Sequence, residues 1–133
     1  MTMPILEARD LSKIFPGPKK LFTPARFVTA VDRVSLAVMP GETLAIVGES
    51  GSGKSTLGRL LLRLLAASEG RVFYLGEEIT DASGARLNQL RRELQIIFQD
   101  PFASLNPRMT VEQIVGSPLA IPGIRDTPAE RLG

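Results

Sequence analysis

Cysteine and histidine are both absent from the 133 residues of this chain. Without cysteine the chain forms no disulfide, offers no thiol nucleophile and lacks the thiolate ligands of structural zinc sites. Without histidine, a Ser-His-Asp triad cannot be assembled from these residues. The lack of disulfides fits a reducing compartment, although it fits many others too. Any chemistry in this chain therefore depends on other groups.

A large charge excess and long apolar runs are missing as well. Lys and Arg number 16 and Asp and Glu 14, and the resulting formal charge of +2 is too small to indicate nucleic-acid binding. No segment reaches the roughly 18 to 20 consecutive apolar residues that a membrane span needs. Glu7, Arg9 and Asp10 interrupt any apolar N-terminal stretch, so we expect no signal peptide. Because hydrophobic residues make up 44% of the sequence, a soluble globular domain, or part of one, is expected.

Short apolar or alternating runs bounded by turn residues predict several β-strands. The run before Gly48 is continuously apolar, as in a strand that is buried on both faces. Pro16–Lys20 is a breaker-rich stretch that predicts a surface loop, and Pro40-Gly41 predicts a turn. The predicted strands are Ile5–Leu11, Val34–Val38, Thr43–Val47, Val72–Leu75 and Leu94–Phe98.

Leucines after residue 56 follow the i, i+3, i+4 spacing of a helix with one apolar face. The stripe comprises Leu57, Leu60, Leu61, Leu64 and Leu65. We expect Arg59 and Arg63 on the solvent side of this helix and Gly70 to end it. A more polar helix is predicted around Ala85–Glu93, and the prolines beyond Gln99 predict loops alternating with short helices.

The last residues carry the start signal of another helix. Thr127-Pro128-Ala129-Glu130 places Thr at the N-cap, Pro at the first helical position and Glu at the third, the pattern of a capping box. Only three residues follow Glu130, too few for a stable helix. We therefore expect the sequence to be part of a longer protein.

The segment Gly48–Thr56 fits the phosphate-loop pattern G-x-x-x-x-G-K-[ST]. Its glycines let the backbone approach a phosphate, and its N–H groups and the following helix N-terminus attract anions. We expect Lys54 to reach the β- and γ-phosphates of a nucleoside triphosphate and the Ser55 hydroxyl to bind Mg²⁺. The candidate nucleotide-binding residues in the loop are Gly48, Ser50, Gly51, Ser52, Gly53, Lys54, Ser55 and Thr56.

A chance match is the alternative explanation of this pattern. With ordinary residue frequencies, a chain of this length matches by chance roughly once in two hundred. The predicted strand before the loop and the predicted helix after it supply the context that the motif requires. The sequence therefore predicts a site for ATP with Mg²⁺.

Groups that would complete hydrolysis are not evident. A phosphate-loop NTPase normally has an Asp at the end of a second apolar strand, completing the Mg²⁺ shell. Glu77 and Glu78 follow Gly76 and are expected to be turn carboxylates on a solvated edge, since Glu is rarely buried. Asp32 follows Val31 without a long apolar lead-in. The hydrolytic carboxylates are therefore expected to be missing from this sequence.

Taken together, the phosphate loop and two later segments resemble the nucleotide-binding domain of ABC transporters. Leu94–Pro101 reads Leu-Gln-Ile-Ile-Phe-Gln-Asp-Pro, and Phe102–Val111 is similar to the bacterial subfamily that imports oligopeptides and dipeptides. The resemblance covers the whole chain from Leu6 onward. The loop is shared by many NTPases, whereas the Gln99–Val111 string is much more particular.

This resemblance implies roles for residues outside the loop. Gln99 resembles the glutamine that contacts Mg²⁺ and the attacking water and couples the site to the membrane subunit, a role suited to an amide that donates and accepts hydrogen bonds. Phe15 resembles the aromatic that stacks on adenine, although Phe22 or Phe27 are alternatives because the Pro16–Arg26 insertion blurs the alignment. Val31 resembles the apolar residue beside that aromatic.

The resemblance further implies a fold, partners and a location. The fold would be an α/β P-loop NTPase of the ABC type, with residues 1–42 as an antiparallel β portion, 43–99 as the P-loop core and 100–133 as the start of a truncated helical subdomain. A second ATP-binding subunit and transmembrane permease subunits, contacted through Gln99–Val111, would be the partners, with no nucleic acid. The chain would lie peripherally on the cytoplasmic face of the cell membrane.

Full-length members of the family continue into a signature motif, a strand ending in Asp-Glu and a switch histidine, none of which occurs here. Three hypotheses therefore remain open at this point. The chain is the energising subunit of a peptide importer, a P-loop kinase or stand-alone NTPase, or a non-catalytic nucleotide-binding fragment. The transported substrate is left open among dipeptides, oligopeptides, glutathione and nickel.

Overall fold

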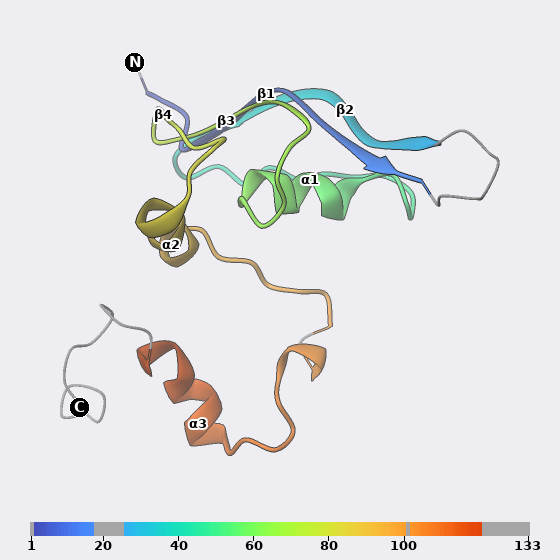
Figure 1. Cartoon of the computed structure of the whole chain (residues 1–133). Coiled ribbons are helices and arrows are strands. Elements are labelled where there is room, and N and C mark those ends of the chain that lie inside the picture. Colours follow the sequence, from blue (N-terminus) through green and yellow to red (C-terminus); the bar gives the residue numbers. More distant parts are fainter. Residues whose placement is uncertain (1, 18–25, 101, 121–133) are drawn as a thin grey trace. The chain divides into compact units, whose positions relative to one another are not determined.

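A computed structural model of the chain describes residues 2–17, 26–100 and 102–120 (Figure 1). The chain divides into two compact units, Met1–Gln95 and Ile96–Gly133. The first contains a sheet and two helices, and the second contains short helices only among its described residues.

The first unit is built on a four-stranded sheet with the order β2-β1-β3-β4, in which all neighbouring strands are antiparallel. The strands are β1 (Leu6–Pro16), β2 (Phe27–Val38), β3 (Glu69–Tyr74) and β4 (Glu77–Glu78). The predicted strands Ile5–Leu11, Val34–Val38 and Val72–Leu75 are confirmed in position, and all three belong to longer strands than predicted, although β3 ends one residue before Leu75. Glu77 and Glu78 are exposed at the sheet edge, as predicted, but they form β4 and not the turn that was expected.

Irregularities in β1 and β2 are stabilised by serine hydroxyls. The register of β1 against β2 shifts between Ala8 and Leu11, and Asp10 has a positive φ of 49°. At such a bulge the ladder leaves backbone groups unpaired. The amide of Asp10 donates to Ser35 Oγ at 2.9 Å, and the amide of Arg33 donates to the buried Ser12 Oγ at 2.9 Å. The two hydroxyls therefore replace the missing ladder bonds.

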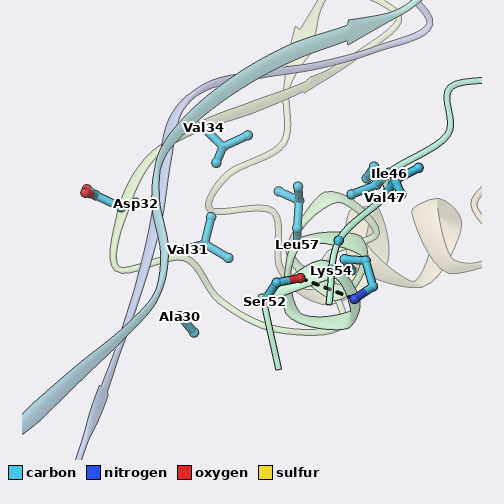
Figure 2. Close-up of a pocket in the computed structure, with 11 residues that line it drawn as sticks. Ala30, Val31, Asp32, Val34, Ile46, Val47, Ser52, Lys54 and Leu57 are labelled. Carbon is cyan, nitrogen blue, oxygen red and sulfur yellow. Dashed lines mark hydrogen bonds between the residues drawn. The ribbon is translucent and has the colours of Figure 1, made fainter. Parts of the chain in front are cut away.

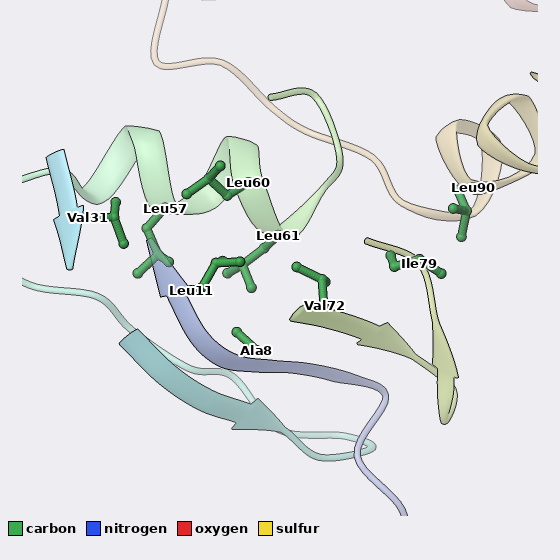
Figure 3. Close-up of a cluster of buried hydrophobic side chains, with 9 residues drawn as sticks. All are labelled: Ala8, Leu11, Val31, Leu57, Leu60, Leu61, Val72, Ile79 and Leu90. Atoms are coloured by element: carbon green, nitrogen blue, oxygen red, sulfur yellow. The ribbon is translucent and has the colours of Figure 1, made fainter. Parts of the chain in front are cut away.

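Helix α1 (Lys54–Leu61) packs its apolar side against one face of the sheet (Figures 1 and 3). Its leucines meet side chains from β1, β2 and β3, and the cluster continues toward α2 (Gly84–Glu93). Fully burying one such leucine contributes roughly 1.5–3 kcal/mol. The buried cluster comprises Ala8, Leu11, Val31, Leu57, Leu60, Leu61, Val72, Ile79 and Leu90.

The helix that follows the phosphate loop is shorter than the leucine stripe predicted. It ends at Leu61 rather than near Gly70, and Leu64 is 43% exposed. Arg63 has a left-handed φ of 55°, which stops the helical ladder. Its guanidinium turns inward and donates to the Ala82 carbonyl at 3.4 Å, so the prediction that Arg63 lies on the solvent side is wrong. Arg59 is exposed, as predicted.

Helix α2 confirms the polar helix predicted around Ala85–Glu93. Arg86 on this helix reaches back to β4, and its Nε donates to Glu77 Oε1 at 3.0 Å. The hydrogen bond from this guanidinium lowers the pKa of the Glu77 carboxyl below its usual value. The ion pair thus joins α2 to the edge of the sheet, on the exposed surface.

Two of the predicted strands are wrong. The segments Thr43–Val47 and Leu94–Phe98 contain no strand, and Val47 and Ile97 are 92% and 94% exposed. An apolar run becomes a strand only when a neighbouring strand pairs with its N–H and C=O groups. Within the described part of the chain, the ladders of β1 to β4 do not include either run.

The described part of the second unit contains three short helices, η1 (Phe102–Ser104), α3 (Val111–Gly116) and η2 (Ser117–Ala120). Alternation of loops with short helices was predicted beyond Gln99. Helix α3 begins with a capping box that the sequence analysis missed. Its Thr110 Oγ1 accepts from the Gln113 amide at 3.3 Å, and Gln113 Oε1 accepts from the Thr110 amide at 2.9 Å. The capping box predicted at Thr127–Glu130 lies outside the described residues.

Replacing Thr110 by Ala should weaken α3. The substitution leaves the Gln113 amide without its side-chain acceptor, a loss worth about 1 kcal/mol in helix stability. Amide exchange measured by NMR should then become faster across Val111–Gly116, while the Thr110→Ser variant keeps the hydroxyl and the slow exchange. Equal exchange rates in the Ala and Ser variants would show that the capping box does not stabilise the helix.

None of the helices in the described part of the chain combines the length and apolar character that a membrane crossing needs.

Candidate functional site

The predicted phosphate loop lies directly before α1. Lys54 is the first residue of this helix and Gly53 is its N-cap. Gly51 and Gly53 have φ values of 81° and 93°, a left-handed conformation that side chains with a Cβ rarely adopt. The amide of Ser52 donates to the Glu49 carbonyl at 3.2 Å, which closes the turn. The second fixed glycine of the motif, Gly53, and Gly51 at one of its variable positions therefore meet real backbone requirements.

Strand β2 fixes the end of this loop. A Cβ added to Gly53 would lie 2.2 Å from the Ala30 carbonyl oxygen and 3.7 Å from Val31 Cγ2. The first contact is with backbone, which cannot move aside as a flexible side chain can. Only glycine fits at this position, and its close approach holds the loop against β2.

The N-terminus of α1 is open for an anion. Among the described residues, no side chain caps the helix and no acidic residue lies in its first turn. The first amides of an α-helix have no partner within the helix, and the helix dipole adds a partial positive charge there. An anionic group in front of Lys54, Ser55 and Thr56 would satisfy these donors.

Lys54 places a full positive charge beside the same end of the helix. Its Nζ donates to the Glu49 carbonyl oxygen and, at 3.2 Å, to Ser52 Oγ (Figure 2). Both acceptors belong to the loop. The ammonium group is therefore held over the loop instead of extending into solvent.

A cavity of about 240 Å³ adjoins the loop (Figure 2). Its walls are apolar side chains from β2, α1 and the segment before the loop, with Ser52 and Lys54 as polar groups. Asp32 belongs to this wall, but its carboxylate points away from the labelled apolar side chains and pairs with Arg33 at 3.5 Å. The lining comprises Ala30, Val31, Asp32, Val34, Ile46, Val47, Gly48, Ser52, Gly53, Lys54 and Leu57.

The structure brings some of the other predicted residues to this place. Val31, predicted to lie beside the nucleotide, is buried and lines the cavity next to Gly53.

Phe15 does not line the cavity; its ring is half-buried in β1, with the ring centre 5.2 Å from Lys13 Nζ. Phe27, the first residue of β2, is 68% exposed and pairs with Pro16 of β1. Phe22 lies outside the described residues. Gln99 belongs to the second unit, so its role beside Lys54 stays a prediction.

Within the described ranges, no three acidic residues come together to hold a metal ion. Mg²⁺ usually keeps several waters and is bound by one or two protein groups together with substrate phosphates. The exposed Ser55 hydroxyl at the start of α1 suits that mode of binding. The single hydroxyl of Ser55 thus fits an Mg²⁺ ion that is bound mainly by the phosphates of a nucleoside triphosphate.

Some contributors to the site were not predicted. The Ala30 carbonyl packs on Gly53, and Val34, Ile46 and Leu57 line the cavity. Leu57 had been predicted only as a core residue. The sequence carries no signal for the contact between Ala30 and Gly53, because this contact involves the backbone carbonyl of a residue in a distant strand.

Comparison with protein families shows that residues 31–131 match the family described as ABC transporter. Among curated proteins, the chain is 48% identical over 132 residues to the glutathione import ATP-binding protein GsiA of Salmonella paratyphi A. It is 46% identical over 130 residues to YkfD of Bacillus subtilis, named for oligopeptide transport and ATP binding. These matches cover 97% and 98% of the chain but only 21% and 38% of the two relatives.

Solved structures of ATP-binding cassettes share the fold. A cassette solved as a dimer in a post-hydrolysis state with ADP and Pi aligns with a TM-score of 0.75 and 26% identity. The alignment covers 95% of this chain and 52% of that one. A cassette from Clostridium perfringens, part of the ABC transporter complex cbiONQ, aligns with a TM-score of 0.72 and 26% identity over 98% of this chain and 47% of its own.

Proposed function

We propose that the chain, which belongs to the ABC transporter family, binds ATP with Mg²⁺ at Gly48–Thr56 as the energy-coupling part of a peptide importer. The observation that carries this proposal is the geometry of the loop. The uncapped N-terminus of α1 and the Lys54 ammonium lie at the same end of one helix. Both favour the phosphates of a nucleotide.

Each loop residue then has a defined task. The amides from Gly51 to Thr56 would surround the phosphates, and Lys54 would contact the β- and γ-phosphates. Ser55 would bind the Mg²⁺ ion, which neutralises negative charge on the phosphates when bound. Val31 would contribute apolar contact to the nucleotide, and Phe15 would stack on adenine. Gln99 would complete the Mg²⁺ shell and orient the attacking water.

The kind of importer is inferred from relatives. The curated relatives are named for glutathione import and for oligopeptide transport, and both cargoes are peptides. This chain spans about a fifth of the glutathione importer subunit and 38% of the oligopeptide one. Its membership in the ABC family favours this function over a kinase, which would make no use of the Gln99–Val111 segment.

Partners follow from the same reasoning. The similar cassette with bound ADP and Pi was solved as a dimer, which supports a second ATP-binding subunit as the partner that completes the hydrolytic site. Transmembrane permease subunits would contact the Gln99–Val111 segment, with the chain at the cytoplasmic face of the membrane. Closure of the two ATP-binding subunits would then pull on the permease.

Thermal unfolding tests the nucleotide site. MgATP at saturating concentration should raise the Tm of the unsubstituted chain, because a ligand that binds only the folded state stabilises it. Lys54→Ala should abolish most of this shift, since the loop loses its only full positive charge. Arg59→Ala is the matched control, because it removes one exposed charge from the same helix outside the loop.

The MgATP-dependent Tm shifts of the unsubstituted chain and the two variants decide whether the nucleotide binds at the loop. A normal shift in Arg59→Ala and none in Lys54→Ala supports a nucleotide site at the loop. Absence of any MgATP-dependent shift in the unsubstituted chain would contradict the proposal. An equal shift in the Lys54→Ala variant would place the nucleotide elsewhere.

A further inference from the structure

The hydroxyl of Ser52 lies between the start of the phosphate loop and its lysine. Ser52 Oγ accepts a hydrogen bond from Lys54 Nζ at 3.2 Å (Figure 2). A Cβ added to Gly48 would lie 2.7 Å from the same oxygen and 3.8 Å from Lys54 Cδ. The hydroxyl therefore packs so closely over Gly48 that the Cβ of any other residue would displace it, while the lysine stem lies at ordinary van der Waals distance.

A lysine side chain at the surface is normally disordered. Fixing its four rotatable bonds costs up to about 2 kcal/mol of conformational entropy. Here the Glu49 carbonyl and the Ser52 hydroxyl accept two of the three ammonium protons. Among the described residues the third proton has no acceptor, which leaves it for an incoming phosphate oxygen. The lysine can therefore bind a phosphate without first giving up its two contacts with the loop.

We propose that Ser52 is a positioning residue that pre-orders the Lys54 ammonium for the phosphates of the nucleotide. This inference rests on the proposed function and adds a side-chain role to a residue whose backbone alone is required by the phosphate-loop pattern. Pre-ordering raises affinity because the entropy of fixing the lysine is lost before the ligand arrives.

The first test needs no ligand. In NMR spectra of the chain labelled with ¹³C-lysine, the two Hε protons of an ordered Lys54 should have distinct chemical shifts, and the Lys54→Ala variant assigns the signal by its loss. In Ser52→Ala the two shifts should move toward the position of a free lysine, because only the Glu49 carbonyl still holds the ammonium group. Ser52→Thr keeps the hydroxyl and should keep the two shifts apart. An unchanged Lys54 signal in Ser52→Ala would overturn the proposal.

The second test measures affinity for MgATP by isothermal titration. Ser52→Ala should weaken binding by about 3- to 10-fold, the size expected for the loss of one hydrogen bond at a partly exposed site. Ser52→Thr should restore most of this affinity. Ser83→Ala is the matched control, an exposed serine at the N-cap of α2 whose side chain makes no capping hydrogen bond in the described structure.

The two tests distinguish this proposal from the one on which it rests. If the unsubstituted chain does not bind MgATP, the proposed function fails, and the NMR signal still shows whether Ser52 orders Lys54. If MgATP binds and Ser52→Ala binds it equally well or more tightly, the nucleotide site stands and the positioning role is refuted.

Discussion

Gly53→Ala is expected to destabilise the fold and to weaken nucleotide binding strongly. The φ of 93° at this position is strained for a residue with a Cβ, at a cost of roughly 1–2 kcal/mol. The added Cβ would also lie 2.2 Å from the Ala30 carbonyl oxygen, so β2 and the loop would have to separate. Together these effects should lower the free energy of unfolding by roughly 3 kcal/mol or more. Urea unfolding measures this loss.

The same substitution should weaken the nucleotide site as well as the fold. Moving the N-terminus of α1 by even about 1 Å misplaces the amides and Lys54 relative to the phosphates, which can cost on the order of 100-fold. Affinity for MgATP, measured on the fraction that remains folded, should fall accordingly. A variant that binds MgATP normally would show that the contact between Gly53 and Ala30 does not position the loop.

Gly51→Ala provides the matched control for this prediction. Gly51 also has a positive φ, of 81°, but an added Cβ meets no atom within 4 Å. The variant should therefore lose only the roughly 1–2 kcal/mol of backbone strain. The difference between the two alanine variants isolates the effect of the close approach to β2.

Leu60→Ala is expected to be a strongly destabilising change in the core. The side chain is 1% exposed and belongs to the buried cluster around α1 (Figure 3). Removing it leaves a cavity, and such substitutions cost about 2–5 kcal/mol. Domains are typically stable by only about 5–15 kcal/mol, so the variant loses a large share of its stability. Urea unfolding, with the slope checked for two-state behaviour, gives the value.

Leu64→Ala is the control on the same leucine stripe. Leu64 is 43% exposed and lies beyond the end of α1, so its removal should cost less than about 1 kcal/mol. If both variants lost equal stability, the leucine stripe would contribute uniformly to the core, and α1 would extend beyond Leu61 in solution.

The parts of the fold that the sequence predicted are those encoded by local patterns. The phosphate loop, the start of α1 and the helix Gly84–Glu93 depend on residues within a few positions of one another. The capping box at Thr110 and Gln113 was equally local and readable in the sequence, yet it was overlooked.

The errors arise where structure depends on distant segments. Thr43–Val47 has the composition of a buried strand, but a strand also needs partners, and composition does not reveal whether they are present. In the sequence, the helical spacing of the leucines continues past Leu61. In the structure, the left-handed backbone of Arg63 stops the helix, and its guanidinium donates to the Ala82 carbonyl. The apposition of Ala30 and Gly53, which fixes the candidate site, likewise joins residues 23 positions apart.

A single short helix belongs to both the site and the core. Lys54, Ser55 and Thr56 form its first turn, and Leu57, Leu60 and Leu61 are its buried residues. Local unfolding of α1 therefore removes the phosphate site and opens the core in one event, with the same free energy. A core substitution that frays this helix therefore lowers nucleotide affinity by the factor by which it lowers the population of the intact helix, because only the intact helix binds the phosphates. Amide exchange at Leu60 should accordingly slow when nucleotide binds, although Leu60 does not line the cavity beside the loop.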